Sequence, residues 1–105
     1  MKEEKKQQIY KLMLCTSSEN FQLDQMNEEA AELLQAINKY KRAKIFSPEK
    51  VEECIEHIAE EMADVENLLN QMKYIFQNDE LVEEYKVKKL KRIVKRIKNR
   101  QGEKV

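Results

Sequence analysis

Apolar residues recur every three or four positions through two long stretches of this chain. They form one stripe in residues 19–42 and another in residues 48–77: Leu23, Met26, Ala30, Leu33, Leu34, Ile37 and Tyr40 in the first, and Val51, Ile55, Ile58, Met62, Val65, Leu69, Met72 and Phe76 in the second. This period is that of an α-helix with one buried face. The chain also has only one Gly and one Pro among its 105 residues, which leaves little room for the turns between strands. The sequence therefore predicts an all-α fold.

Shorter helical stretches flank the long pair. The predicted helices cover residues 3–14, 19–42, 48–77 and 80–98, in a single helical domain spanning residues 1–105. Two long helices with wide apolar stripes and two short ones make a thin bundle that leaves apolar surface uncovered. We therefore expect a bundle of about four helices that is completed by oligomerisation.

Local signals mark the helix ends. Thr16 and Glu19 have capping-box spacing at the start of the second helix. Ser47 can cap the third helix, and Pro48 suits its first turn because that position needs no N–H. The last helix follows a hinge at residues 78–79. Its apolar residues are expected to face inward: Leu81, Tyr85, Leu90, Ile93 and Ile97.

The charges are balanced overall but unevenly distributed. The chain has 20 basic and 20 acidic residues, with an acidic middle and a strongly basic segment from Lys86 to Arg100. No apolar run approaches the ~20 residues of a membrane span, and the N-terminus is unlike a signal peptide. Cys15 and Cys54 have no metal-ligand spacing. We expect a cytoplasmic protein with reduced thiols and no membrane segment.

Two acidic motifs lie beside the apolar stripes. Glu29 and Glu32 are three residues apart on the first long helix, as are Glu61 and Asp64 on the second, so each pair lies on one helical face. Two antiparallel helices would bring all four carboxylates together, with each pair at ~6 Å repelling by roughly 3 kcal/mol at an effective dielectric of 20. Glutamates on helices are commonly solvated. Paired motifs beside apolar stripes instead favour a hard divalent cation such as Mg²⁺. A di-iron centre would need Glu-x-x-His motifs, and Cys54 stands three positions before the only histidine, His57.

The arrangement of the two acidic motifs resembles the signature of a known enzyme family. Glu28-Glu29-x-x-Glu32, a spacer, and Glu61-x-x-Asp64 are similar to the motif of the MazG-like, all-α nucleoside triphosphate pyrophosphohydrolases. The surrounding segments, residues 29–37 and 60–65, are family-like as well. The resemblance covers roughly residues 20–76 and, more loosely, the basic last helix.

The resemblance implies cleavage of a ribo- or deoxyribonucleoside triphosphate to the monophosphate and pyrophosphate, in house-cleaning or control of nucleotide pools. It implies Mg²⁺ as the cofactor, with Mn²⁺ as a substitute. Four positions carry over as metal-binding and catalytic residues: Glu29, Glu32, Glu61 and Asp64. Any carboxylate not fully used as a ligand could accept a proton from the attacking water. Relatives are dimers or pairs of dimers with a pocket shared between subunits, which implies a homodimer or a dimer of dimers.

Substrate contacts are expected from polar residues outside the acidic motifs. Lys86, Lys89 and Arg92 are similar to phosphate-binding residues on the last helix of some relatives, although a solvated basic face is an equally good interpretation. Gln71 stands where many relatives have Asn near the base or sugar, and Gln25 lies on the stripe of Glu29. The alternative hypothesis is a non-catalytic helical module whose basic last helix binds nucleic acid or an acidic partner. The acidic centre disfavours nucleic acid, because it would repel a duplex.

Overall fold

The computed structural model describes residues 1–103 of the chain and consists of helices. The elements are α1 (Glu3–Thr16), α2 (Glu19–Phe46), the short 3-10 helix η1 (Pro48–Lys50), α3 (Val51–Phe76) and α4 (Asp79–Glu103). No strand occurs among the described residues, so the all-α prediction is confirmed. α2 extends four residues beyond the predicted end at residue 42, and α4 extends beyond the predicted end at residue 98.

The helix ends differ in detail from the predicted caps. Ser18, not Thr16, caps α2, because its hydroxyl accepts a hydrogen bond of 3.1 Å from the backbone N–H of Phe21. Thr16 instead belongs to the last turn of α1, where its hydroxyl donates to the carbonyl of Leu12. Pro48 begins η1, and the side chain of Ser47 makes no capping hydrogen bond. The hydroxyl caps therefore cannot all be assigned from spacing alone.

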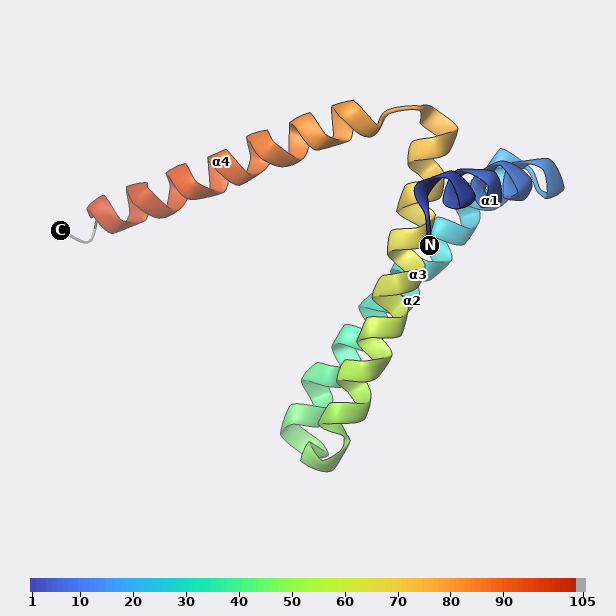
Figure 1. Cartoon of the computed structure of the whole chain (residues 1–105). Helices are drawn as coiled ribbons and strands as arrows, with labels where there is room; N and C mark the ends of the chain where they lie inside the picture. Colours follow the sequence, from blue (N-terminus) through green and yellow to red (C-terminus); the bar gives the residue numbers. More distant parts are fainter. Residues whose placement is uncertain (104–105) are drawn as a thin grey trace.

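α2 and α3 pack side by side along their length and form the body of the molecule (Figure 1). Small residues allow the two backbones to approach: Ala36 is 1% exposed and Ala43 is 7% exposed. η1 closes the turn between the two helices at one end of this hairpin. The antiparallel arrangement brings the middle of α2 beside the middle of α3, which is where the two acidic motifs lie.

α1 lies across the other end of the hairpin (Figure 1). The side-chain amide of Gln71 on α3 is 1% exposed and donates a 3.3 Å hydrogen bond to the backbone carbonyl of Tyr10 on α1. The ring of Tyr10 is also buried, and its centroid lies 6.1 Å from that of Tyr74 on α3. The amide of Gln22 donates to Ser17 in the turn between α1 and α2. These contacts fix α1 over the end of the hairpin opposite η1.

α4 extends away from the hairpin after a sharp turn (Figure 1). Gln77 ends α3 in the left-handed conformation, with φ of 51°, and α4 begins two residues later. The predicted inward face of α4 is wrong for the single chain. The residues assigned to that face are all about half exposed or more: Leu81, Tyr85, Leu90, Ile93 and Ile97. Among residues 1–103, no helix combines the length and apolar character needed to cross a bilayer.

Candidate metal centre

Three carboxylates from the two acidic motifs come together between α2 and α3. Glu29 and Glu32 lie one turn apart on α2, and Glu61 lies on the facing turn of α3. One carboxylate oxygen from each of the three lies within 4.8 Å of the other two. Three carboxylates this close repel one another unless protons or a cation reduce their charge.

Glu61 is the most buried member of this cluster. Its exposure is 9%, and Oε1 lies 3.2 Å from Nε2 of His57, one helical turn earlier on α3. Its other oxygen, Oε2, is buried without a hydrogen-bond partner, as is Oε2 of Glu29. A buried carboxylate oxygen without a partner is costly, so a group that binds it would remove that penalty.

Electrostatics single out Glu29 within the cluster. Partial burial is the largest cause, and together with the nearby charges of Glu32 and Asp64 it raises the pKa of the Glu29 carboxyl from the ordinary 4.5 to about 7. A pKa near neutrality means that Glu29 holds a proton much of the time when no cation is near. A bound cation would favour the ionised carboxylate and displace that proton.

Asp64 lies beside the three-carboxylate cluster but is not a member of it. Its side chain is exposed, and together with Glu29 it lines a pocket of about 410 Å³ between α1 and the hairpin. α1 contributes Lys6, Ile9 and Tyr10 to the same pocket. The pocket therefore has two predicted cation ligands, Glu29 and Asp64, on the hairpin side. Its other side is formed by α1, which lies outside the acidic motifs.

The donor set suits a hard divalent cation. Mg²⁺ and Mn²⁺ take oxygen ligands, and Mg²⁺ sites in proteins often use a few carboxylates and leave other positions to water and phosphate oxygens. Glu29, Glu32 and Glu61 supply carboxylate oxygens alone, with two of these oxygens buried and unpartnered. The residues present therefore fit such an ion, with Asp64 next to them as a fourth carboxylate.

The predicted substrate residues are not brought to this centre within one chain. Lys86, Lys89 and Arg92 are exposed on α4 and do not line the pocket that contains Glu29. Gln71 is buried at the contact between α3 and α1, and its side chain does not line that pocket. The amide of Gln25 donates to Glu28 at 3.4 Å, also outside the pocket.

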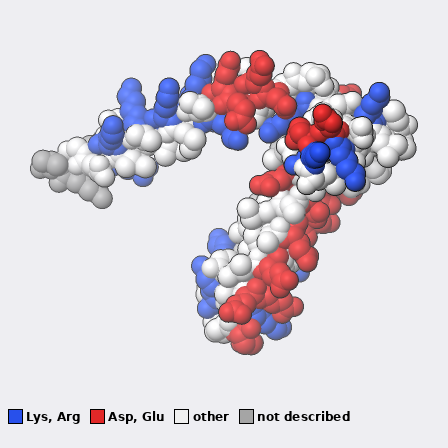
Figure 2. All heavy atoms as spheres, in the orientation of Figure 1, with Lys and Arg blue, Asp and Glu red and all other residues white. Residues whose placement is uncertain are grey.

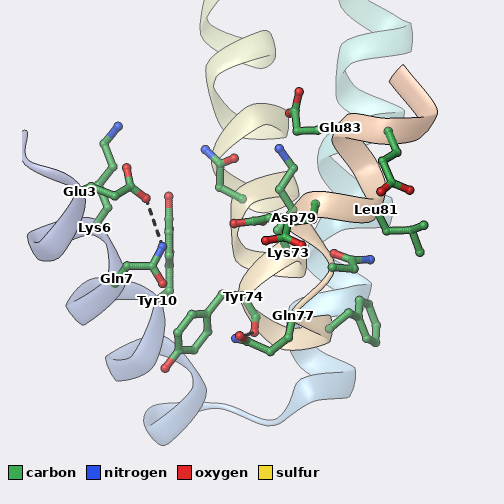
Figure 3. A pocket seen from close by; sticks show the side chains of 15 residues that line it. Glu3, Lys6, Gln7, Tyr10, Lys73, Tyr74, Gln77, Asp79, Leu81 and Glu83 are labelled. Atoms are coloured by element: carbon green, nitrogen blue, oxygen red, sulfur yellow. Dashed lines mark hydrogen bonds between the residues drawn. The ribbon is translucent and has the colours of Figure 1, made fainter. Parts of the chain in front are cut away.

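A larger and more polar pocket lies at the corner where α3 meets α4 (Figure 3). It has a volume of about 860 Å³, and its wall includes Gln7 and Tyr10 of α1, Tyr74 of α3 and Glu83 of α4. None of the four predicted ligands lines it. We therefore regard the smaller pocket, which contains Glu29 and Asp64, as the candidate site.

Two residues of the site were not predicted from the sequence. His57 contacts Glu61, and their separation of four residues on one helix was a signal that could have indicated the contact. Lys6 lines the pocket with Glu29, but only the placement of α1 across the hairpin reveals this. No sequence pattern within α1 marks Lys6 apart from its neighbour Lys5.

Comparison of the chain with protein-family models, curated proteins and solved structures gives no match.

Proposed function

We propose that this protein is a Mg²⁺-dependent nucleoside triphosphate pyrophosphohydrolase, with the site between α2 and α3. The observation that carries the proposal is the buried Glu61 carboxylate, which has an unpartnered oxygen and lies within 4.8 Å of carboxylate oxygens from Glu29 and Glu32. The likeness of the two acidic motifs to those of MazG-like enzymes supports the reaction type. The adjoining pocket of about 410 Å³ supports a small-molecule substrate.

The chain's own residues would have distinct parts in this reaction. Glu29, Glu32 and Glu61 would hold the cation, and Asp64 would complete the set from the pocket side. A bound Mg²⁺ would neutralise triphosphate charge and polarise the phosphorus that water attacks. His57 would orient Glu61 through its contact with Oε1. A carboxylate oxygen of this set that does not bind the cation would accept the proton of the attacking water.

Cations near the carboxylates would bind the phosphate oxygens of the substrate. Lys6 lines the same pocket as Glu29 and Asp64, and its ammonium can pair with a phosphate. Lys86, Lys89 and Arg92 would act on phosphates only if a second copy brings α4 to the pocket. The proposal therefore includes a homodimer or a pair of dimers.

A matched pair of variants tests this function. Glu61→Gln keeps the size of the side chain but removes the buried charge, whereas Glu60→Gln changes the exposed neighbour. Both variants and the unaltered protein are incubated with Mg²⁺ and a panel of ribo- and deoxyribonucleoside triphosphates. We expect turnover of at least one nucleotide in the unaltered protein and Glu60→Gln, and none above background in Glu61→Gln. Equal turnover in both variants would contradict the proposed site.

A second candidate function is an interaction module that binds polyanions through α4. The observation in its favour is that residues 86–100 contain nine Lys and Arg and no acidic residue, all on an exposed helix. The two functions differ in their response to ions. A metal enzyme is stabilised by Mg²⁺ through mass action, whereas a polyanion-binding module responds little to Mg²⁺ and binds with a steep dependence on salt.

A further inference from the structure

α4 has two opposite faces, and neither is covered by another part of residues 1–103. At ~100° per residue, the apolar side chains of its segment 87–97 fall within about one third of the helix circumference. These are Val87, Leu90, Ile93, Val94 and Ile97, each between 47% and 61% exposed. The opposite face is basic and contains Lys88, Arg92 and Lys95. A helix of this kind requires a partner for its apolar face, because exposed aliphatic rows are unfavourable in water.

α3 has an unpartnered apolar row of its own. Ile55, Met62, Leu69 and Phe76 are spaced by seven residues, so they lie on one side of the helix, and each is between 42% and 51% exposed. The neighbouring row, Ile58, Val65 and Met72, is half-buried. Alternating spacings of three and four residues between these rows are the pattern of a helix that receives another helix along a coiled-coil seam.

The two helices that carry these surfaces are similar in length and opposite in charge. α3 has 26 residues and α4 has 25, so each is about 38 Å long at 1.5 Å per residue. α3 contains seven carboxylates and one lysine, whereas residues 86–100 of α4 contain nine basic residues and no acidic ones. Figure 2 shows acidic side chains gathered along the hairpin and basic side chains along the outer part of α4. Complementary charge favours their association and disfavours pairing of like helices.

We infer that α4 is an exchanged arm: its apolar face packs on the exposed α3 row, Ile55 to Phe76, of a second copy of this chain. In a twofold dimer each copy gives one arm and receives one, so the contact is made twice. Within its own chain α4 turns away from α3 after Gln77, which leaves both surfaces free for the partner. The inference specifies which two helices meet, α4 of one copy and α3 of the other. It does not depend on the hydrolase activity.

Mass measurement by light scattering tests whether the face of α4 drives association. We expect the full chain to be a dimer, and the double variant Leu90→Gln/Ile97→Gln to raise the dimer dissociation constant by at least about tenfold. The control Lys95→Gln changes the opposite face of α4 and should leave the constant within about threefold. Circular dichroism verifies that all three proteins are helical. A monomeric unaltered chain, or equal effects of the two changes, would overturn the inference.

A mixed sample distinguishes exchange between copies from folding back within one copy. One batch of the full chain is labelled with ¹⁵N, and a second, unlabelled batch carries a nitroxide at residue 95 through Lys95→Cys, with Cys15 and Cys54 replaced by Ser. After mixing, we expect selective broadening of ¹⁵N amides in residues 55–76, because only a partner's α4 can deliver the spin label. Broadening seen only when label and nitroxide are on the same chain would overturn the inference. The inference would also be overturned by a monomeric chain whose α4 amide resonances shift when a DNA duplex is added.

The outcomes remain separate from those of the proposed enzyme. A dimer with exchanged arms and no turnover of any nucleotide would support this inference and contradict the hydrolase. Turnover by a monomer would support the hydrolase reaction, but it would overturn the exchange and the dimer that the proposed function includes.

Discussion

His57 and Glu61 lie one turn apart on α3, with Nε2 of the histidine 3.2 Å from Oε1 of the glutamate. The contact fixes one oxygen of a carboxylate that is 9% exposed and leaves the other without a partner. The histidine side chain is itself 42% exposed, so it connects the buried carboxylate to the surface. Such a pair is a suitable arrangement for orienting a metal ligand.

His57→Ala should therefore weaken the metal site without unfolding the protein. Loss of a residue that orients a ligand commonly lowers metal affinity or activity by about 10- to 100-fold. We expect the Mg²⁺ concentration for half-maximal turnover to rise within this range. His57→Gln retains a donor and should restore part of the affinity, which a purely space-filling role for His57 would not explain. An unchanged Mg²⁺ dependence in His57→Ala would exclude the orienting role.

Removing a charge from the cluster should stabilise the metal-free fold. In Glu61→Gln, one of three crowded carboxylates loses its charge, so the thermal midpoint measured in EDTA should rise, by about 4–8 °C for each kcal/mol of repulsion removed. Added Mg²⁺ should raise the midpoint of the unaltered protein more than that of the variant. The exposed control Glu60→Gln should follow the unaltered protein in both conditions. An unfolded Glu61→Gln would instead indicate a structural role for this carboxylate.

The raised pKa of Glu29 should make the metal-free fold less stable as the pH rises. Between about pH 4.5 and 7, the folded state retains a proton on Glu29 that the unfolded chain releases. The contribution of Glu29 to the free energy of unfolding therefore falls with increasing pH across this window and is constant on either side of it. Urea denaturation in EDTA at several pH values measures the slope. Glu29→Gln should reduce the slope, whereas Glu28→Gln, an exposed neighbour, should retain it.

Lys6 should contribute to nucleotide binding through the pocket that it shares with Glu29 and Asp64. In Lys6→Gln we expect KM for the triphosphate to rise by about tenfold, because one charged hydrogen bond to phosphate is lost. Lys5→Gln removes a charge from the exposed neighbouring position and serves as the control. Initial-rate measurements at saturating Mg²⁺ give both values. If the two variants had the same KM, the total charge of α1 would account for the effect, and the position of Lys6 in the pocket would not.

Gln71 should act mainly in holding α1 on the hairpin. Gln71→Ala removes the 3.3 Å hydrogen bond to the Tyr10 carbonyl at a position that is 1% exposed. We expect the free energy of unfolding to fall by about 1–3 kcal/mol, because a buried hydrogen bond and the packing of the side chain that makes it are lost. Chemical denaturation measures this change. A rise in KM without loss of stability would instead support the substrate contact expected from the family resemblance.

The sequence predicted the parts of the fold that depend on neighbouring residues along a helix. Apolar periodicity predicted the two long helices, and spacings of three residues predicted which carboxylates share a face. The meeting of Glu29, Glu32 and Glu61 then required only that the two helices pair antiparallel. Antiparallel pairing could be predicted because only a short connection, which forms η1 in the structure, lies between the two helices.

Features that depend on contacts between distant elements could not be predicted in this way. α1 could cross the hairpin at several places, so periodicity did not identify Lys6 as a residue of the pocket. The apolar side of α4 was expected to face inward because its pattern is amphipathic. An amphipathic pattern indicates that a face requires cover, but it does not say whether the cover comes from the same chain. Leu90, at 61% exposed, is the clearest example.

The most direct test of the proposed reaction is product identification by ³¹P NMR after incubation with Mg²⁺ and each nucleoside triphosphate. The proposal predicts a nucleoside monophosphate and pyrophosphate in equal amounts from at least one nucleotide, and loss of both in Glu61→Gln. Formation of diphosphate and phosphate, or no product from any nucleotide, would contradict it.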